Sequence, residues 1–267
     1  MKGQDFDERL GKQIKIPNSI AKTRSLASIA LDHRFKKDFV FHAKRAQFFQ
    51  DIHRGERCFL IGSGPSLNET NLGLIRYELS YGVNTLYRGL DKFKIKCKYW
   101  GAVDGKLFAA QHKELLNLKT TLFLAEHAGQ RFLEQKETYL KNSRNAPIVL
   151  RNLGSMNIWN KFSEDITKGV YSGGSSIIQA LQVLYYMGFQ EVVLIGCDCG
   201  TKDGHYRFED TPVANPMGKG ICGDWKYLID AFKVCKKAFE DDDRTILNAT
   251  VGGELEVFER IRLEDAV

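Results

Sequence analysis

Short apolar runs alternate with amphipathic stretches along most of the chain. The runs are rich in Val, Ile, Leu and aromatic residues, which is typical of strands buried on both faces of a parallel sheet. Candidate strands lie at residues 57–62, 83–87, 99–103, 121–125, 148–151, 191–195 and 245–247. Helical patterns separate several of these strands, and the alternation predicts an α/β fold, a Rossmann-like, mostly parallel sheet flanked by helices.

The first 55 residues lack strand-like runs. Leu31, Phe35 and Phe39 recur at i, i+4 and i+8 among charged residues, which indicates an amphipathic helix. We therefore expect a helical N-terminal extension over residues 1–55 and a Rossmann-like domain over residues 56–267.

The clearest helix–strand unit begins at residue 172. A stretch rich in Gly and Ser precedes a helical pattern that runs to Met187, and Gly188 supplies the stop. The strand at 191–195 follows, so Asp198 is expected at the carboxyl edge of the sheet. Open α/β sheets bind their ligands at that edge.

The formal net charge of +6 favours acidic ligands such as phosphates, nucleotide-sugars or anionic membrane surfaces. The basic residues crowd the first 60 positions, at Arg34, Lys36, Lys37, Lys44, Arg45, Arg54 and Arg57. Solvated helix faces explain this crowding most simply. The alternative is a basic surface that holds the protein at the inner face of a membrane.

Cysteine usage indicates a reducing compartment. The six cysteines form no CxxC pair, and no signal-like apolar stretch opens the chain. Cys197 and Cys199 are too few ligands for a metal site. No apolar run approaches the roughly 20 residues needed to span a bilayer, so we expect a cytoplasmic protein whose membrane contact is at most peripheral.

A glycine-rich loop, Gly62-Ser63-Gly64-Pro65-Ser66, follows the first strand. Its glycines allow a tight turn close to a ligand, Pro65 stiffens the turn, and the two serines add hydroxyl groups. The loop matches neither GxGxxG nor the Gly-Lys-Ser/Thr ending of a P-loop, so a nicotinamide cofactor is not expected. A cradle for phosphate or ribose and a purely structural turn fit the composition equally well.

A second stretch, Tyr171-Ser172-Gly173-Gly174-Ser175-Ser176, precedes a helix. Unpaired backbone N–H groups, the helix dipole and several hydroxyl groups converge at such a point and suit an anion. The alternative is an ordinary N-cap whose glycines permit close packing of the helix on the sheet.

A third polar segment, from Asp198 through residues 201–207, follows a buried strand. Loops in this position often hold catalytic groups. Asp198 or His205 is a candidate general base, because a carboxylate or imidazole near neutral pH can accept a proton from an attacking hydroxyl. A histidine in a loop is more often a simple surface residue.

Together these segments resemble the MptE-like and motility-accessory-factor family. The resemblance extends from about residue 55 to the end of the chain. It is carried by the segments 61–68, 82–84, 99–104, 171–176, 187–192, 195–198, 205, 218–220 and 248–258.

The order of motifs is also similar to that of the bacterial CMP-sialic-acid sialyltransferases, which are inverting and metal-independent. This resemblance implies donor-binding roles for Gly62, Ser63, Gly64, Ser66, Asn84, Asp104, Ser172 and Gly173. Pro65, Gly174 and Ser175 belong to the same loops, and we count them among the nucleotide-binding candidates. Tyr206 stands where a tyrosine hydroxyl in that family helps the phosphate leave.

The chain departs from the sialyltransferase pattern at the catalytic base. The stretch 216–224 contains no histidine, and Cys199 and Gly200 follow Asp198 where a tyrosine is expected. If the chain is a transferase, its base is therefore His205 or Asp198.

Three functions remain open. The first is a sialyltransferase-like glycosyltransferase, with no metal cofactor, that moves a sugar from a nucleotide donor, CMP-linked by preference, to a saccharide or glycoprotein acceptor in surface polysaccharide or glycoprotein assembly. The second is an MptE-like pyrophosphokinase that transfers diphosphate from ATP to 6-hydroxymethyl-dihydropterin, with Mg²⁺ held by Asp104 and Asp198. The third is a non-enzymatic binding protein, suggested by charge alone. Basic and aromatic residues mix over 87–99, but a half-buried strand explains them better, so no nucleic-acid partner is expected. We place the glycosyltransferase first.

Overall fold

The computed structural model describes residues 39–126, 147–200, 205–209 and 225–267. The chain divides into two compact units, residues 1–40 and 41–267. Most of the first unit lies outside the described residues, so the expected helix through Leu31 and Phe35 stays a prediction. Everything below concerns the second unit.

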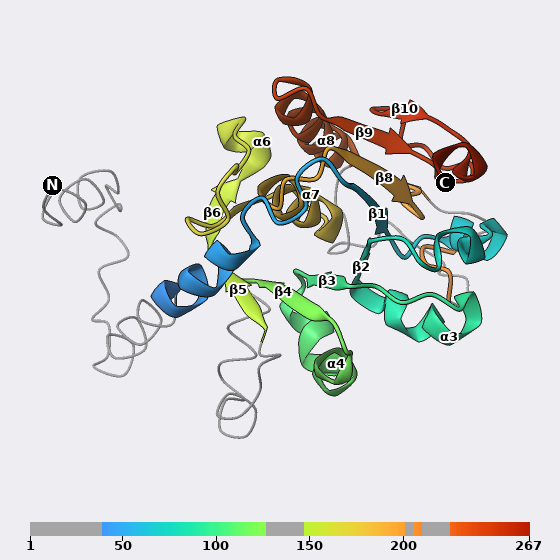
Figure 1. The fold of residues 1–267 in the computed structure, drawn as a ribbon, viewed down its shortest axis with the longest axis horizontal. Helices are drawn as coiled ribbons and strands as arrows, with labels where there is room; N and C mark the ends of the chain where they lie inside the picture. Colours follow the sequence, from blue (N-terminus) through green and yellow to red (C-terminus); the bar gives the residue numbers. More distant parts are fainter. Residues whose placement is uncertain (1–38, 127–146, 201–204, 210–224) are drawn as a thin grey trace, which may run out of the picture. The chain divides into compact units, whose positions relative to one another are not determined.

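A parallel sheet of eight strands forms the centre of this unit (Figure 1), as the alternation of strands and helices predicts. The strand order is β10-β9-β8-β1-β2-β3-β4-β5, and every neighbouring pair is parallel. The strands are β1 (Arg57–Ile61), β2 (Ser80–Val83), β3 (Tyr99–Ala102), β4 (Thr121–Ala125), β5 (Ile148–Leu150), β8 (Glu191–Ile195), β9 (Thr245–Asn248) and β10 (Glu259–Arg260). The chain runs outward from β1 to β5 and then returns to the other side of β1 with β8. This reversal between β1 and β8 is the topological switch point at which open α/β sheets bind ligands.

Most of the predicted strands are confirmed, but the second is misplaced. A strand was expected at 83–87, whereas β2 ends at Val83 and a 3₁₀ helix, η5, runs over Asn84–Gly89. Asn84 has a φ of 49°, in the left-handed region, and this ends the extended backbone. Ser80 begins β2 although it is polar and buried, because its hydroxyl donates to the Lys96 carbonyl at 3.0 Å.

Two short strands missing from the sequence analysis form a separate parallel ribbon. These strands are β6 (Asn152–Ser155) and β7 (Val170–Ser172), and Ser155 pairs with Ser172. The residues of β6 are all half-buried, and the strand contains Gly154, so the apolar pattern that marks the central strands is absent.

Among the described residues, the α-helices include α3 (Leu90–Phe93), α4 (Gly105–Asn117), α6 (Met156–Trp159), α7 (Ser176–Tyr186) and α8 (Trp225–Glu240), and residues 39–46 are also helical. Short 3₁₀ helices are η2 (Gln47–Phe49), η3 (Pro65–Glu69), η4 (Leu72–Ile75) and η6 (Leu263–Ala266). Gly188 has a φ of 87° directly after the C-cap of α7, as its predicted role as a helix stop requires.

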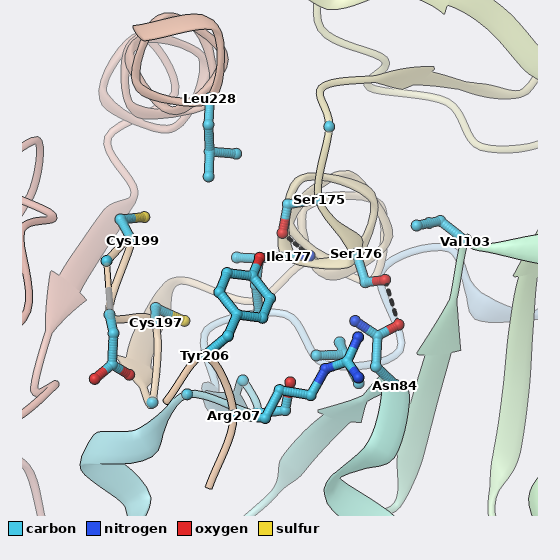
Figure 2. A pocket seen from close by; sticks show the side chains of 18 of the residues that line it. Asn84, Val103, Ser175, Ser176, Ile177, Cys197, Cys199, Tyr206, Arg207 and Leu228 are labelled. Carbon is cyan, nitrogen blue, oxygen red and sulfur yellow. Dashed lines mark hydrogen bonds between the residues drawn. The ribbon is translucent and has the colours of Figure 1, made fainter. Parts of the chain in front are cut away.

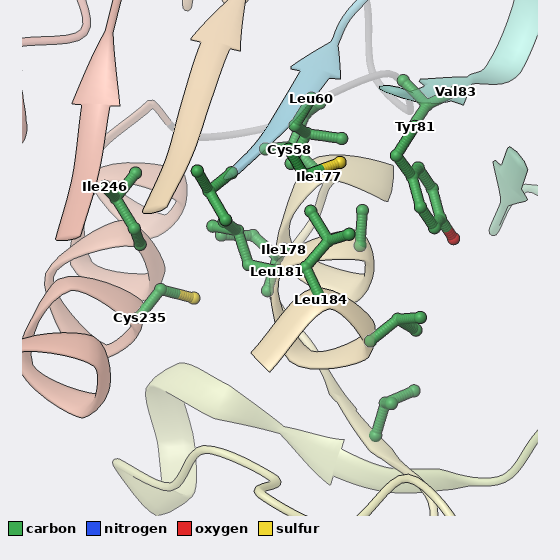
Figure 3. Packing of buried hydrophobic residues seen from close by; sticks show 14 of the residues in the cluster. Cys58, Leu60, Tyr81, Val83, Ile177, Ile178, Leu181, Leu184, Cys235 and Ile246 are labelled. Carbon is green, nitrogen blue, oxygen red and sulfur yellow. The ribbon is translucent and has the colours of Figure 1, made fainter. Parts of the chain in front are cut away.

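The core lies where α7 packs on the sheet. Cys58 and Leu60 of β1 and Tyr81 and Val83 of β2 point toward α7 (Figure 3). Phe59 and Ile61 alternate with them and are equally buried, so β1 has an apolar environment on both faces. Fully burying one Leu or Ile contributes roughly 1.5–3 kcal/mol, so this contact fixes the position of α7 and of its first turn.

A buried glutamine fixes the approach to α7. Gln182 is fully buried in the middle of the helix, and its amide oxygen accepts from the backbone N–H of Tyr171 at 2.9 Å and of Ser163 at 3.2 Å. Its amide nitrogen donates to the Tyr171 carbonyl at 2.9 Å. The chain that leads from β7 into α7 is therefore held to the helix by a satisfied polar group.

Residues 41–55, which the sequence analysis groups with the N-terminal extension, pack on the sheet. Ala46 belongs to the core, and His53 stacks on Phe189 with ring centroids 4.5 Å apart. Arg45 donates to the Pro147 carbonyl at 3.0 Å, so its guanidinium holds the fold together, while Lys44 is exposed. None of the described helices is long and apolar enough to cross a membrane.

Candidate functional site

A pocket lies at the carboxyl ends of β1 and β8, where the strand order reverses. Its lining residues come from seven places along the chain: the segments 62–64, 83–84, 103–104, 174–177, 196–200 and 206–207, and Leu228 with Phe232 in α8. All three polar segments found in the sequence therefore contribute to one cavity (Figure 2).

The glycine-rich loop is pressed against the end of β8. The Gly62 and Gly64 N–H groups donate to the carbonyls of Ile195 at 2.7 Å and of Gly196 at 3.0 Å. A Cβ on Gly62 would lie 2.2 Å from the Gly196 oxygen, closer than real atoms approach. These glycines line the pocket, but the close approach that requires them is to β8, and their N–H groups are engaged within the protein.

Asp198 holds this loop in place. Its carboxylate is 6% exposed and accepts from the Ser66 N–H at 3.1 Å and from the Ser66 hydroxyl at 2.8 Å. A Cβ on Gly64 would lie 1.8 Å from Asp198 Oδ2. Asp198 lines the pocket as expected, and its hydrogen bonds with Ser66 are those of a residue that positions the loop.

Asn84 and the first turn of α7 form the opposite wall. The Asn84 Oδ1 atom accepts from the Ser176 hydroxyl at 2.7 Å, so the amide N–H₂ is the group left to serve a ligand. Ser175 is the N-cap of α7, and its hydroxyl oxygen accepts from the Ile177 N–H at 3.2 Å. The helix dipole and the amide groups of this turn favour an anion in the pocket.

A short segment, residues 205–209, closes another side. The Phe208 N–H donates to the Ser63 carbonyl at 3.0 Å, and the Asn68 side chain donates to the Phe208 carbonyl at 2.9 Å. The Phe208 ring is buried against Phe93, with centroids 5.3 Å apart. Because Phe208 is anchored to the glycine-rich loop, Tyr206 and Arg207 are held in the wall of the pocket.

Arg207 is the positive charge of the described lining. Its guanidinium lies 5.9 Å from the centroid of the Tyr206 ring. Among the residues the structure describes, no carboxylate pairs with it. Figure 2 shows Tyr206 directed toward the first turn of α7 and Arg207 toward Asn84.

The negative charges of the lining are Asp104 and Asp198. Asp104 Oδ1 accepts from the Lys106 N–H at 2.7 Å at the start of α4. Within the described ranges, no three His, Cys, Asp or Glu side chains gather closely enough to hold a metal ion. Burial raises the pKa of the Cys197 thiol well above its usual value, and nearby Cys199 and Asp198 raise it further, so this thiol stays protonated and is not a nucleophile.

The pocket brings together most of the site residues expected from the sequence, namely Gly62, Ser63, Gly64, Asn84, Asp104, Gly174, Ser175, Asp198 and Tyr206. Five others do not line the described pocket: Pro65, Ser66, Ser172, Gly173 and His205.

Each of these five has another environment. Pro65 and Ser66 are buried in η3, and His205 is half-buried beside the pocket segment. Ser172 is exposed and donates to the Gly154 carbonyl at 3.1 Å. Gly173 lets α7 and α8 pack closely, since a Cβ there would lie 2.6 Å from Ile178 and 2.8 Å from Ala231.

The sequence analysis assigned no role to several lining residues, among them Arg207, Leu228 and Phe232, and it named Ser176 only as part of the stretch before α7. Arg207 lies two residues after His205 in a segment already considered, so its charge was a usable signal. The apolar residues of α8 gave no sequence signal that they line a pocket, because a lining position and a core position look alike in a helical pattern.

Residues 34–204, more than half of the chain, match the model of a protein family described as 6-hydroxymethylpterin diphosphokinase MptE-like. None of the curated proteins compared with the chain matches it. Among solved structures, the chain is similar to the MAf glycosyltransferase from Magnetospirillum magneticum AMB-1, with a TM-score of 0.50 and 16% sequence identity. The similarity covers 86% of this chain and 39% of that one, so this chain spans about two fifths of that protein's length. At this identity the likeness shows the fold alone.

Proposed function

This chain belongs to the MptE-like family, and from that premise we propose that it is a glycosyltransferase whose pocket between β1 and β8 holds a nucleotide-activated sugar. The family and the structural neighbour support a transferase that is glycosyltransferase-like or kinase-like. The observation that carries our choice is the meeting of Arg207, Tyr206 and the first turn of α7 in one pocket at the switch point of the sheet.

The charge of the pocket favours a donor with one phosphate. The charged residues of its described lining are Arg207, Asp104 and Asp198, and +1 − 2 gives a formal charge of −1. A triphosphate carries several negative charges and needs a cation to offset this repulsion. A CMP-linked sugar brings one phosphodiester, which a single guanidinium and a helix N-terminus can hold without a metal.

The chemistry is displacement at the anomeric carbon with inversion. The bond from that carbon to the phosphate oxygen breaks as the acceptor oxygen attacks from the opposite side. The Tyr206 hydroxyl and the Arg207 guanidinium stabilise the negative charge that develops on the leaving phosphate. The acceptor's proton goes to one of the two candidate bases, Asp198 in the pocket or His205 beside it.

The pyrophosphokinase is the second candidate, because the family description names that activity and two carboxylates line the pocket. Mg²⁺ is bound by one or two carboxylates together with substrate phosphates, so either Asp104 or Asp198 would hold the ion together with the phosphates of ATP. When bound, the ion would neutralise the charge that develops on the transferred diphosphate.

Calorimetric titration with CMP, CDP, UDP, GDP and ATP, each with Mg²⁺ and then with excess chelator, separates the two. The glycosyltransferase predicts that CMP binds equally well in chelator and that Ser63→Ala weakens this binding. Binding of ATP that requires Mg²⁺ and is lost in Asp104→Asn would establish the kinase instead. Absence of binding by every nucleotide would refute both.

A further inference from the structure

A tryptophan stands exposed at the end of the β6–β7 ribbon. Trp159 is 58% exposed and its neighbour Ile158 is 76% exposed, in the short helix α6. The indole lies over Gly154, where a Cβ would be 2.8 Å from Trp159 Nε1, and Gly154 has a φ of 120°. The ribbon therefore carries a glycine at the position that leaves room for the indole.

Three contacts connect this helix and the strand β6 before it to residues next to the pocket lining. The Ser172 hydroxyl donates to the Gly154 carbonyl at 3.1 Å. Ser172 is two residues before Gly174, which lines the pocket. The Ser155 and Tyr227 hydroxyls are hydrogen-bonded at 2.6 Å, and the Asn157 side chain donates to the Tyr227 carbonyl. Tyr227 directly precedes Leu228, which lines the pocket. Ser172 is two residues from the pocket lining and Tyr227 is one, so short stretches of chain and single hydrogen bonds connect the base of α6 to the rim of the pocket.

A polar groove adjoins the same helix. Asn157 and Asn160, which flank Ile158 and Trp159 in sequence, line it together with Glu164, Tyr185 and Asp230. Its volume of about 750 Å³ falls within the roughly 300–1,000 Å³ usual for small-molecule sites. Amide and carboxylate oxygens and amide N–H groups are the partners that sugar hydroxyls use.

We infer that Trp159 is the platform on which a pyranose ring of the acceptor stacks, with the adjoining groove holding its hydroxyls; this rests on the proposed glycosyltransferase function. A pyranose presents an apolar face of C–H groups and a rim of hydroxyls. The face of an indole is flat, apolar and partly negative, so it attracts polarised C–H groups. The contacts of Ser172 and Tyr227 connect the platform to the rim of the donor pocket, so an acceptor bound there extends toward the donor's sugar.

The charge of the groove narrows the class of acceptor. Lys233 and Lys237 also line it, but Lys233 is paired with Asp230 at 3.1 Å, and Lys237 is paired with Asp241, just beyond the end of α8, at 2.7 Å. Glu164 adds further negative charge, whereas Asp242 is paired with Arg244 at 2.7 Å. The groove therefore suits a neutral sugar and disfavours a sugar acid.

The test is saturation-transfer NMR on the full chain with lactose, chitotriose and sialyllactose as probes. The variants are Trp159→Ala and Trp159→Phe, and Tyr77→Ala is the control because it removes an aromatic side chain that is 85% exposed and takes no part in the pocket lining. CMP binding is measured on the same samples. Thermal unfolding shows whether each variant remains folded.

We expect transfer to the C–H protons of lactose or chitotriose in the wild type, in Trp159→Phe and in Tyr77→Ala. Trp159→Ala should weaken this binding about fivefold to tenfold and leave CMP affinity unchanged. No transfer to either neutral sugar, equal transfer in Trp159→Ala, or a dimer that dissociates in Trp159→Ala would overturn the inference. Sugar binding without CMP binding would instead count against the donor pocket alone.

Discussion

The substitution Gly64→Ala tests the packing on which the pocket depends. The new Cβ would lie 1.8 Å from Asp198 Oδ2 and 2.8 Å from the Gly196 oxygen, so the loop and the Asp198 carboxylate cannot both stay in place. Overpacking costs about 1–3 kcal/mol, and displacing a carboxylate from its donors costs about 1.5–3 kcal/mol for each charged hydrogen bond. These terms overlap, so we expect a loss of about 3 kcal/mol in the free energy of unfolding.

For a unit of this size, 3 kcal/mol lowers Tm by about 6–12 °C. Differential scanning calorimetry measures this, and titration with CMP measures the accompanying loss of nucleotide affinity. Gly73→Ala is the matched control, because the nearest atom to its new Cβ, Asn71 Oδ1, is 3.1 Å away at an exposed position. If Gly64→Ala kept both the Tm and the CMP affinity of the wild type, the described contact between loop and carboxylate would be refuted.

Three further predictions concern the pocket, its support and the core. Arg207→Gln should raise the Kd for CMP about tenfold to a hundredfold and flatten its dependence on salt, by calorimetry, because one charged hydrogen-bonding partner of the phosphate is lost; unchanged affinity would exclude Arg207 from phosphate binding. Arg260→Ala should lower the unfolding free energy, measured in urea, by about 1–3 kcal/mol. Its guanidinium donates to the carbonyls of Thr250 at 3.1 Å, Gly252 at 2.8 Å and Gly253 at 3.1 Å, and a variant as stable as the wild type would show that these hydrogen bonds do not stabilise the loop. Burial raises the pKa of Tyr99 to about 12 from an ordinary value of about 10. The unfolded chain therefore loses this proton first, and the unfolding free energy falls between pH 10 and 12. In urea unfolding, Tyr99→Phe should show a shallower fall of the unfolding free energy with pH than the wild type, and an identical fall would argue against a buried phenol.

The sequence predicted most strands of the sheet because the central ones are buried on both faces, but it missed the two-residue edge strand β10, which is exposed or half-buried. Runs such as Phe59 to Ile61 and Val192 to Ile195 are apolar without alternation, and in the structure they are fully buried. The glycine and serine stretches at strand ends pointed correctly to the carboxyl edge. Parallel strands bring their ends to one edge, so pattern alone was enough to gather these segments.

The roles of individual residues in those segments depended on contacts between distant parts of the chain. Gly62 packs on Gly196, and Gly173 packs on Ala231. The residues of each pair are far apart in the sequence, so the sequence pattern does not reveal that they meet. Ser66 was counted with the nucleotide-binding residues, yet its hydroxyl donates to Asp198, 132 residues away. Arg207 enters the pocket only because Phe208 is anchored beside it on Ser63.

A crystal structure of the protein with CMP, grown in the presence of chelator, tests the central claim most directly. The account predicts density for the phosphate within hydrogen-bonding distance of the first turn of α7 and of the Arg207 guanidinium, with the nucleoside in the pocket between β1 and β8. Nucleotide bound anywhere else, or a phosphate in this pocket that contacts neither α7 nor Arg207, would contradict it.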